Sequence, residues 1–339
     1  MGDVVNTIGK IDFVILWVDG NDPDWIEERK KYSPSSNDDS SIKRYRNWDN
    51  LQYFFRGVEK YASWVNNIFF ITYGHIPNWL NVNHPKLRII KHEDYMPKEC
   101  LPTFNSNSIE LMINRIEELS EQFVLFNDDM FLLKKTNYTD FFKKNLPCDT
   151  ACLNIHSIST SKMCTYASLQ ATGIINKYFD MKKSILGNFF KWFNPIYGRQ
   201  LFKTLYLFPC KAFPEIRQLH LPYSYLKSVF DEVWEKEEKL LLETCRNKYR
   251  TKLDYSHWTM RNWQIAKGSF YPRSPYFGKS FYLADDNSLN DCVNYIKKSK
   301  GSVICINDSD IDDDEFIRYR NMVNASLDEL LPGKSNYEI

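Results

Sequence analysis

The chain contains 339 residues, of which 43% are hydrophobic and 26% are charged, and its formal net charge is +1. This composition is typical of a globular protein, and the near-zero net charge excludes a general electrostatic attraction to nucleic acid. No apolar run approaches the roughly 18 residues of a transmembrane helix, and residues 1–10 lack the apolar core of a secretory signal. The eight cysteines form no C-x-x-C pair and favour free buried thiols, so we expect a cytoplasmic protein.

The first predicted strand spans residues 11–18, a nearly continuous apolar run (IDFVILWV). Asp19 and Gly20 follow it directly and Pro23 comes soon after, which favours a tight, exposed loop. A polar stretch at 34–41 (PSSNDDSS) is expected to form another loop, either over a site or as a mobile insertion. Asp19 therefore leaves its strand at the carboxyl end, where open α/β sheets bind their ligands.

Helix and strand patterns alternate through the following hundred or so residues. Apolar residues at helical spacing predict a helix from Leu51 to Tyr61, and residues 67–73 and 87–91 are typical of strands. A second helix is predicted at 107–119, because apolar side chains recur there at spacings of three and four. This alternation favours a mostly parallel sheet covered by helices.

The run at 123–131 (FVLFNDDMF) indicates a buried strand that ends in two adjacent carboxylates, Asp128 and Asp129. If this strand lies parallel and close to the first, Asp19 and the two later acids converge on one edge of the sheet. Carboxylates in that place suit Mg²⁺ or Mn²⁺ and a phosphorylated substrate. The alternative interpretation is a polar turn that simply leaves the strand.

The composition changes in residues 156–215. Between Asp180 and Glu215 there are six basic residues, no acidic one and many aromatic ones. One interpretation is a surface that docks on a membrane or a lipid-linked polymer. The other is a helical region whose aromatic side chains form a small core of their own.

The last part of the chain is predicted to contain a helix at 221–244, a strand at 301–306 and a final helix. The strand ends in Asn307 and Asp308. The acidic run 308–315 has some features of a calcium loop, but it lacks the central glycine and the closing glutamate. We interpret these acids as the first turn of a helix that ends near Leu331, where they complement the helix dipole.

Four blocks of this sequence together resemble the Stealth family of sugar-1-phosphate transferases. They are residues 11–23 (IDFVILWVDGNDP), about 44–133, the segment from His220-Leu221-Pro222 to about Asp254, and 304–308 (ICIND). The ending LDELLPGKSNYE also resembles the family. Its members include bacterial capsule polymerases and the animal enzyme that adds N-acetylglucosamine-1-phosphate to lysosomal glycoproteins. The resemblance covers most of the chain, but residues 157–215 match no part of it.

The expected fold is α/β, with a Rossmann-like, mostly parallel sheet flanked by helices and an inserted helical region. Three parts are expected. Residues 1–155 would form a nucleotide-sugar-binding α/β half, and residues 156–215 the helical, basic and aromatic insertion. Residues 216–339 would form the second part of the catalytic core and the C-terminal helix.

The resemblance implies a reaction in which an acceptor hydroxyl attacks the β-phosphate of a UDP-sugar, so that the sugar leaves with its phosphate and UMP is released. Phosphoryl transfer needs positioning, charge neutralisation and a base. The residues suited to hold Mg²⁺ or Mn²⁺ against the diphosphate are Asp128 and Asp129, with Asp19 and Asn307 or Asp308.

Catalytic roles are implied for His220, Arg250 and Asp129. His220 would be the general base, because neutral imidazole accepts a proton near pH 7; a histidine before Leu-Pro also suits a loop or a cap. Arg250 would clamp the phosphates as a fixed cation; its alternative is a charge on a helix surface.

A second group is expected to bind the substrates: Trp17, Asp19, Gly20, Arg56, Asn105 and Glu110. Trp17 would wall the uracil pocket, or else belong to the core. Arg56 would contact phosphate, or else pair with Glu59. Glu110 would hold sugar hydroxyls, or complete a capping box with Asn107.

We therefore expect an enzyme that transfers hexose-1-phosphate or N-acetylhexosamine-1-phosphate to a sugar hydroxyl, forming a phosphodiester in a capsular or other cell-surface polysaccharide. The acceptor would be a saccharide or a lipid-linked oligosaccharide, with peripheral contact at the inner face of a bacterial membrane. One alternative is a metal-dependent glycosyltransferase that releases UDP, and the other is a non-catalytic carbohydrate-binding protein. Nucleic acid is not an expected partner.

Overall fold

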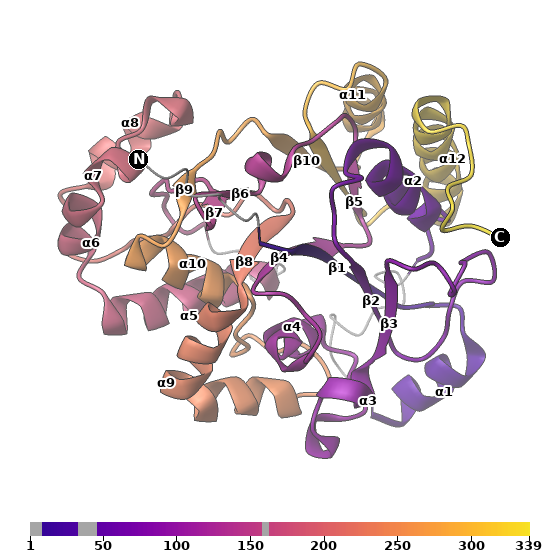
Figure 1. The fold of residues 1–339 in the computed structure, drawn as a ribbon, viewed down its shortest axis with the longest axis horizontal. Coiled ribbons are helices and arrows are strands. Elements are labelled where there is room, and N and C mark those ends of the chain that lie inside the picture. Colours follow the sequence, from indigo (N-terminus) through magenta and orange to yellow (C-terminus); the bar gives the residue numbers. More distant parts are fainter. Residues whose placement is uncertain (1–8, 33–45, 158–162) are drawn as a thin grey trace, which may run out of the picture.

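The computed structural model describes residues 9–32, 46–157 and 163–339, and its centre is a five-stranded sheet in the order β3-β2-β1-β4-β8 (Figure 1). The strands are β1 (Ile11–Trp17), β2 (Ile68–Thr72), β3 (Leu87–Lys91), β4 (Gln122–Asn127) and β8 (Tyr223–Leu226). Strands β1 to β4 are parallel, whereas β8 pairs antiparallel with β4. The predicted α/β class with a mostly parallel sheet is confirmed.

Two three-stranded sheets accompany the main one. The first contains β10 (Gly278–Tyr282), β11 (Val303–Asn307) and β5 (Met130–Leu132); the second contains β6 (Phe142–Lys143), β7 (Leu146–Asp149) and β9 (Tyr271–Pro272). The strand predicted at 301–306 is β11, which pairs antiparallel with β5. Because β5 begins directly after Asp129, this pairing brings the end of β11 to the end of β4.

Helices cover the sheet and form the insertion. Their bounds are α1 (Pro23–Tyr32), α2 (Leu51–Tyr61), α3 (His92–Tyr95), α4 (Ser106–Leu111), α5 (Met163–Tyr178), α6 (Met181–Gly187), α7 (Phe189–Trp192), α8 (Gln200–Leu207), α9 (Lys227–Arg246), α10 (Trp258–Lys267), α11 (Asp286–Lys297) and α12 (Asp313–Leu330). Short 3₁₀ turns lie at Lys98–Cys100, Ile113–Arg115, Tyr138–Asp140 and Pro195–Tyr197.

Both faces of the main sheet are buried, which explains why its strands are nearly continuous apolar runs. Phe13 and Phe70 point into a core shared with α2, α11 and α12. Val14 and Phe69 point into a second core shared with α4, α9, α10 and the insertion. The two groups of helices lie on opposite sides of the sheet in Figure 1.

Two predicted helices differ from the observed elements. The helix predicted at 107–119 begins at Ser106, ends at Leu111 and gives way to a 3₁₀ turn. The helix predicted at 221–244 begins only at Lys227, because Tyr223–Leu226 form β8. Aromatic residues in alternation favour a strand there, and this strand covers the edge that β4 would otherwise leave open.

The insertion contains α5 to α8, all within residues 156–215. Trp192, Tyr197 and Phe213 are buried in the second core rather than in a core of their own. Phe202 and Tyr206, in contrast, are exposed. The interpretation as a separate small core is therefore wrong for these buried side chains, and the interpretation as a docking surface stays a prediction. The division of the chain into three parts stays a prediction.

The remaining sequence expectations have mixed outcomes. The acids at 308–315 precede and open α12, with Asp312 as its N-cap, as predicted. All eight cysteines are free, but Cys164 and Cys210 are exposed rather than buried. The loop at 34–41 lies outside the described residues. In the described part of the chain, no helix is long and apolar enough to cross a membrane.

Candidate active site

The ends of β1 and β4 place the first acids at the same edge of the main sheet. The two strands pair in parallel with Leu16 opposite Asn127. Asp19 follows β1 and Asp128 and Asp129 follow β4, so their backbones leave the sheet at the same edge. The predicted adjacency of the two strand ends is confirmed.

His220 reaches this edge through β8. In the antiparallel pairing of β4 with β8, Leu125 lies opposite Tyr223, so the chain that leads into β8 lies near the end of β4. The backbone of His220 has φ 49°, a left-handed conformation that is uncommon outside glycine. The Tyr223 hydroxyl accepts a hydrogen bond from the His220 backbone N–H over 3.2 Å. Left-handed residues of this kind gather at functional sites.

Asp129, His220 and Cys305 form a compact cluster, and one ligand atom from each lies within 4.8 Å of the others. The Cys305 thiol donates to Asp129 Oδ2 over 3.2 Å, and its sulfur lies 3.8 Å from His220 Nδ1. Asp129 Oδ1 is buried and has no hydrogen-bond partner among the described groups. An orphaned buried carboxylate oxygen is costly and points to a missing cation or substrate donor.

The two carboxyl groups after β4 resist ionisation. Asp128 as a whole residue is exposed to solvent. Surrounding protein atoms nevertheless displace much of the water around its carboxyl group. This desolvation, together with the nearby Asp129 charge, raises the pKa of Asp128 to about 7. Burial also raises the pKa of Asp129, although His220 and the Cys305 thiol oppose that shift. A divalent cation would relieve this repulsion.

The donor set fits Mg²⁺ or Mn²⁺ better than a metal that prefers sulfur. Burial, reinforced by the Asp129 charge, raises the pKa of the Cys305 thiol well above its usual range. Cys305 therefore stays a protonated donor rather than a thiolate ligand. The oxygens of Asp128 and Asp129 are then the candidate ligands, and oxygen is what Mg²⁺ and Mn²⁺ prefer.

Asn307 and Asp308, the other predicted metal ligands, are partly engaged elsewhere. The amide nitrogen of Asn307 donates to Ser280 Oγ and to the Cys305 sulfur. One Asp308 oxygen accepts from the Ser309 backbone and the other lies 4.0 Å from Arg46. Asn307 thus adjoins the cluster through Cys305, whereas Asp308 contacts Ser309 and lies near Arg46.

A second cluster joins Arg250 to α4. The Arg250 guanidinium donates to Ser106 Oγ, and the same serine hydrogen-bonds Glu110. Glu110 is 4% exposed, and burial raises its pKa to about 7 against the opposing effect of Arg250. Its carboxylate lies 3.7 Å from His257 Nε2, and burial lowers the pKa of His257 to about 3, so this imidazole is neutral near pH 7.

Asn105 connects two parts of this second cluster through hydrogen bonds. Its Oδ1 accepts from the Asn107 backbone and caps α4, while its Nδ2 donates to Asp254 Oδ2 over 2.7 Å. Asp254 in turn accepts from the Thr251 backbone and hydroxyl. Asn105 therefore ties the start of α4 to the loop that carries Arg250. The capping-box interpretation of Glu110 is wrong, because the helix cap is Asn105 rather than Asn107.

The loop after β1 is held in place by a histidine. The Asp19 backbone N–H donates to His75 Nε2 over 2.8 Å, and Asp19 Oδ1 accepts from the Asn21 backbone. Trp17 packs edge-on against the same histidine at 5.4 Å and against Phe70, yet it stays partly exposed. Gly20 is buried within this turn.

Arg56 contacts the C-terminal segment of the chain, and its role in binding substrate stays a prediction. Its guanidinium makes two hydrogen bonds to the Glu338 carboxylate, at 2.9 and 2.8 Å, and further bonds to Asp328 and the Leu331 carbonyl. These contacts fasten the C-terminal segment to α2. We therefore leave Arg56 out of the proposed site.

Sequence spacing does not identify three residues that lie next to Asp129 or Glu110. Cys305 stands in the ICIND block, so its position could have been noted there. Ser106 follows Asn105 in a loop already expected near the site. His257 has no partner pattern in the sequence, because its contacts come only from tertiary packing: its Nδ1 lies 2.6 Å from the Tyr225 hydroxyl and its Nε2 lies near Glu110.

Comparison with known proteins places the chain in a family. Residues 9–37 match Stealth protein CR1, conserved region 1, and residues 44–149 match Stealth protein CR2, conserved region 2. The chain is 44% identical to the capsular polysaccharide phosphotransferase WcwK of Streptococcus pneumoniae over 97% of its length and 98% of that protein. It is 40% identical to the receptor polysaccharide phosphotransferase WefC of Streptococcus gordonii, over 98% and 100% of the two chains.

Two further comparisons are more distant. The exopolysaccharide phosphotransferase cps2G of Lactiplantibacillus plantarum is 36% identical, over 97% of this chain and 96% of that protein. The solved apo structure of the bifunctional glycosyltransferase WbbM is similar with a TM-score of 0.39 and 9% identity, covering 98% of this chain and 53% of that one. From the sequence relatives, whose lengths are matched almost completely, we conclude that this chain belongs to the Stealth family of phosphotransferases.

Proposed function

We propose that this enzyme transfers hexose-1-phosphate or N-acetylhexosamine-1-phosphate from a UDP-sugar to a sugar hydroxyl, with release of UMP. The observation that carries the proposal is the Asp129–His220–Cys305 cluster, with Asp128 beside it. Residues directly after β4, before β8 and in β11 here combine acids suited to a cation with a base suited to a hydroxyl. Phosphoryl transfer requires that pairing of charge neutralisation and proton removal.

The acids would hold the cation and, through it, the diphosphate of the donor. Asp128 and Asp129 would supply the oxygen ligands. Asp129 Oδ1, which is buried without a hydrogen-bond partner among the described groups, is the strongest candidate to bind the cation. When bound, Mg²⁺ or Mn²⁺ would neutralise negative charge on the phosphate oxygens. Asp19, Gly20 and Trp17 border the same edge and would receive the nucleotide part of the donor.

His220 would remove the proton from the acceptor hydroxyl. Its Nδ1 faces the Cys305 sulfur, which leaves Nε2 to take the proton. The carboxylate of Asp129, which interacts electrostatically with His220, would stabilise the imidazolium that forms. The oxygen of the acceptor then attacks the β-phosphorus, and the bond between this phosphorus and the bridging oxygen of UMP breaks.

Arg250 and Glu110 would act on the sugar and phosphate side of the donor. Arg250 is partly exposed and shares Ser106 with Glu110, so its guanidinium keeps donors for a phosphate. Glu110 is held by Ser106 and lies close to neutral His257, which suits hydrogen bonding to sugar hydroxyls. Asn105 and Asp254 would position Arg250 without touching the donor.

The acceptor would be a growing capsular or cell-surface polysaccharide, as the names of the relatives suggest. The product would be a phosphodiester between two sugars. A lipid-linked oligosaccharide would present such an acceptor at the inner face of a bacterial membrane.

The fate of the donor's β-phosphorus tests this proposal. We expect ³²P placed in the β-phosphate of the UDP-sugar to move to the saccharide acceptor, and the Asp129→Asn variant to leave it on the nucleotide-sugar. A matched reaction with ³²P in the α-phosphate should leave the acceptor unlabelled. Recovery of all β-label as nucleotide, together with an elongated acceptor, would mean that the enzyme transfers the sugar alone.

A further inference from the structure

The insertion presents an unusually apolar outer surface. We define the α6–α8 surface by its exposed large apolar side chains, which are Leu186, Phe189, Phe190, Ile196, Phe202, Leu205 and Tyr206. Phe190, Tyr206 and Phe202 are 84%, 80% and 72% exposed and are the three most exposed aromatic side chains of the described residues. Figure 1 shows α6, α7 and α8 grouped at one edge of the molecule, away from α11 and α12. Patches of this kind mark an interaction surface.

Helix α8 is oriented to keep its apolar stripe outside. Phe202, Leu205 and Tyr206 follow one another at spacings of three and one, so they share one face of the helix. Thr204 and Leu207 are buried on the other face, where Thr204 Oγ1 accepts from the Leu153 backbone over 3.1 Å. The buried side fixes the helix, and the apolar residues that would normally be buried face solvent instead.

The segment that forms this surface is strongly cationic. Residues 181–214 contain six basic residues and no acidic one, in a chain whose net charge is only +1. Lys182, Lys183, Arg199, Lys203 and Lys211 are all exposed. Exposed lysines beside exposed Phe, Leu and Tyr suit the headgroup region of an anionic bilayer, where the cations meet lipid phosphates and the apolar groups enter the acyl boundary.

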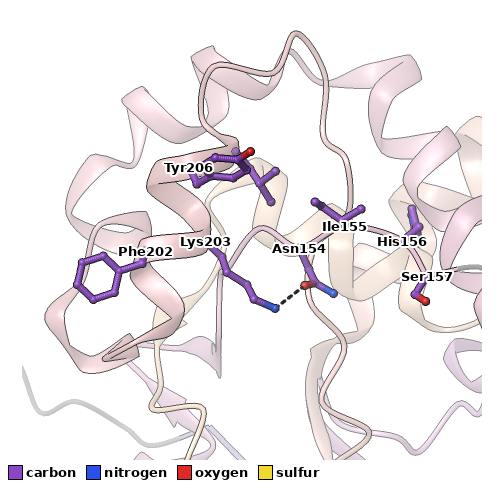
Figure 2. Close-up of a pocket in the computed structure, with 8 residues that line it drawn as sticks. Asn154, Ile155, His156, Ser157, Phe202, Lys203 and Tyr206 are labelled. Atoms are coloured by element: carbon purple, nitrogen blue, oxygen red, sulfur yellow. Dashed lines mark hydrogen bonds between the residues drawn. The ribbon is translucent and has the colours of Figure 1, made fainter.

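The polar groups beside α8 argue for lipid rather than saccharide. A groove of about 780 Å³ lies between residues 154–157 and α8, and Phe202, Lys203 and Tyr206 line it (Figure 2). Its Lys203 Nζ donates to Asn154 Oδ1 over 3.1 Å, and Asn154 Nδ2 donates to Glu215 over 2.7 Å. These groups already satisfy one another, whereas a sugar site needs polar groups aimed at the ligand.

We propose that the α6–α8 surface binds the anionic face of a lipid bilayer, with Phe190, Phe202 and Tyr206 inserted among the headgroups. The purpose of this contact rests on the proposed function, because a lipid-linked acceptor would be presented at that face. The binding itself does not depend on the reaction. It can therefore be measured separately from phosphoryl transfer.

Vesicle sedimentation tests the apolar part of the surface. We expect the wild-type chain to bind vesicles of phosphatidylglycerol and phosphatidylcholine, and the triple variant Phe190→Ser, Phe202→Ser, Tyr206→Ser to bind about 10²-fold more weakly. The matched triple Ile76→Ser, Val82→Ser, Ile317→Ser removes exposed apolar groups elsewhere and should bind like the wild type. Thermal melting should stay unchanged for the first triple, because its side chains are largely exposed. Equal vesicle binding by that triple and the wild type would overturn the inference.

A charge series tests the cationic part. Lys182→Gln, Lys183→Gln, Lys203→Gln should weaken binding to the anionic vesicles by about 10-fold or more, and higher salt should narrow the difference. Lys297→Gln, Lys298→Gln, Lys300→Gln, at exposed positions on and after α11, should bind normally. Equally strong wild-type binding to pure phosphatidylcholine vesicles would contradict an electrostatic contact.

A water-soluble oligosaccharide acceptor separates this inference from the proposed function. We expect the apolar triple to transfer β-³²P to it at the wild-type rate while failing to bind vesicles. Vesicle binding without any transfer by the wild type would count against the proposed function and leave the surface assignment intact. Loss of binding to the soluble acceptor in the triple, with vesicle binding retained, would instead identify a saccharide subsite and overturn the inference.

Discussion

The carboxylate of Asp129 depends on side chains that lie far apart in the sequence. Cys305 donates to one of its oxygens, His220 stands beside it, and the other oxygen is buried without a partner among the described residues. Burial and the neighbouring Asp128 make two ionised carboxylates costly in this place. A site built in this way is suited to binding a cation.

The first prediction is that the reaction needs a divalent cation held by Asp129. Asp129→Asn should lower turnover by at least about 10²-fold, because an amide cannot replace the charge that neutralises the diphosphate. Chelation with EDTA should abolish the wild-type rate, and Mg²⁺ or Mn²⁺ should restore it. Asp291→Asn, at an exposed position of α11, is the control and should keep full activity. Undiminished turnover in EDTA would rule out the assigned role of both acids.

The second prediction concerns the proposed base. His220→Asn should lower turnover by about 10²-fold or more while UDP-sugar binding persists. Asparagine tolerates the left-handed backbone at this position, so the fold should survive the change. The acidic limb of the wild-type kcat profile, where the base becomes protonated, should disappear in the variant. A variant with near-normal rate and an unchanged profile would show that His220 is structural.

The third prediction is a pH-dependent gain in stability from Glu110→Gln. The folded pKa of Glu110, about 7, lies above its model-compound value of 4.5, so folding favours the protonated form. Its contribution is fully present below about pH 4.5 and is lost as the pH rises through 7. The variant should therefore gain up to about 3 kcal/mol relative to wild type between pH 5 and pH 8. Chemical denaturation at both pH values measures this, with Glu117→Gln as the control at an exposed position. A difference that does not grow with pH would contradict the buried environment.

At the scale of elements, strand pairing decides which residues meet. Strand β8 follows His220 and pairs with β4, and β11 carries Cys305 against β5, which starts right after Asp129. The site is thus assembled at the point where two sheets share one stretch of chain. Helix α2 has a structural role, because its Arg56 forms hydrogen bonds to Glu338 in the C-terminal segment.

The fourth prediction separates that structural duty from catalysis. Arg56→Ala should lower the free energy of unfolding by roughly 3 kcal/mol, since it leaves the Glu338 side chain, which is 4% exposed, without its cationic partner. The KM for the donor should not change. Arg318→Ala breaks an exposed pair with Asp286 and should lower the free energy of unfolding far less, because solvent screens that pair. A raised KM for Arg56→Ala with unchanged stability would return this arginine to the binding site.

Over the whole molecule, sequence patterns predicted single helices and strands better than contacts between residues that are distant in the sequence. The strands at 11–18, 67–73, 87–91 and 123–131 were recognisable because buried parallel strands are apolar on both faces. The same parallel architecture predicted that Asp19, Asp128 and Asp129 leave the sheet at one edge. The pattern at 221–226 predicts a helix where the structure has β8, since a short aromatic segment is ambiguous until its partner strand is known.

The remainder of the site depends on contacts that no local pattern encodes. His220 and Arg250 were found only through resemblance to a family. Cys305 meets Asp129 across 176 residues, and Arg56 meets Glu338 across 282 residues. Pairings at such separations are set by the complete fold, so sequence spacing could not distinguish a substrate-binding arginine from one that fastens the chain's end.

The central claim is that the enzyme breaks a phosphorus–oxygen bond of the donor and leaves the sugar's C1–O bond intact. The most direct measurement is the nucleotide and the saccharide formed from a UDP-sugar and acceptor, by chromatography and ³¹P NMR of one reaction. The account predicts UMP and a phosphodiester resonance in equal amounts, with the donor's anomeric configuration retained. UDP as the sole nucleotide, beside a phosphorus-free glycoside, would contradict it.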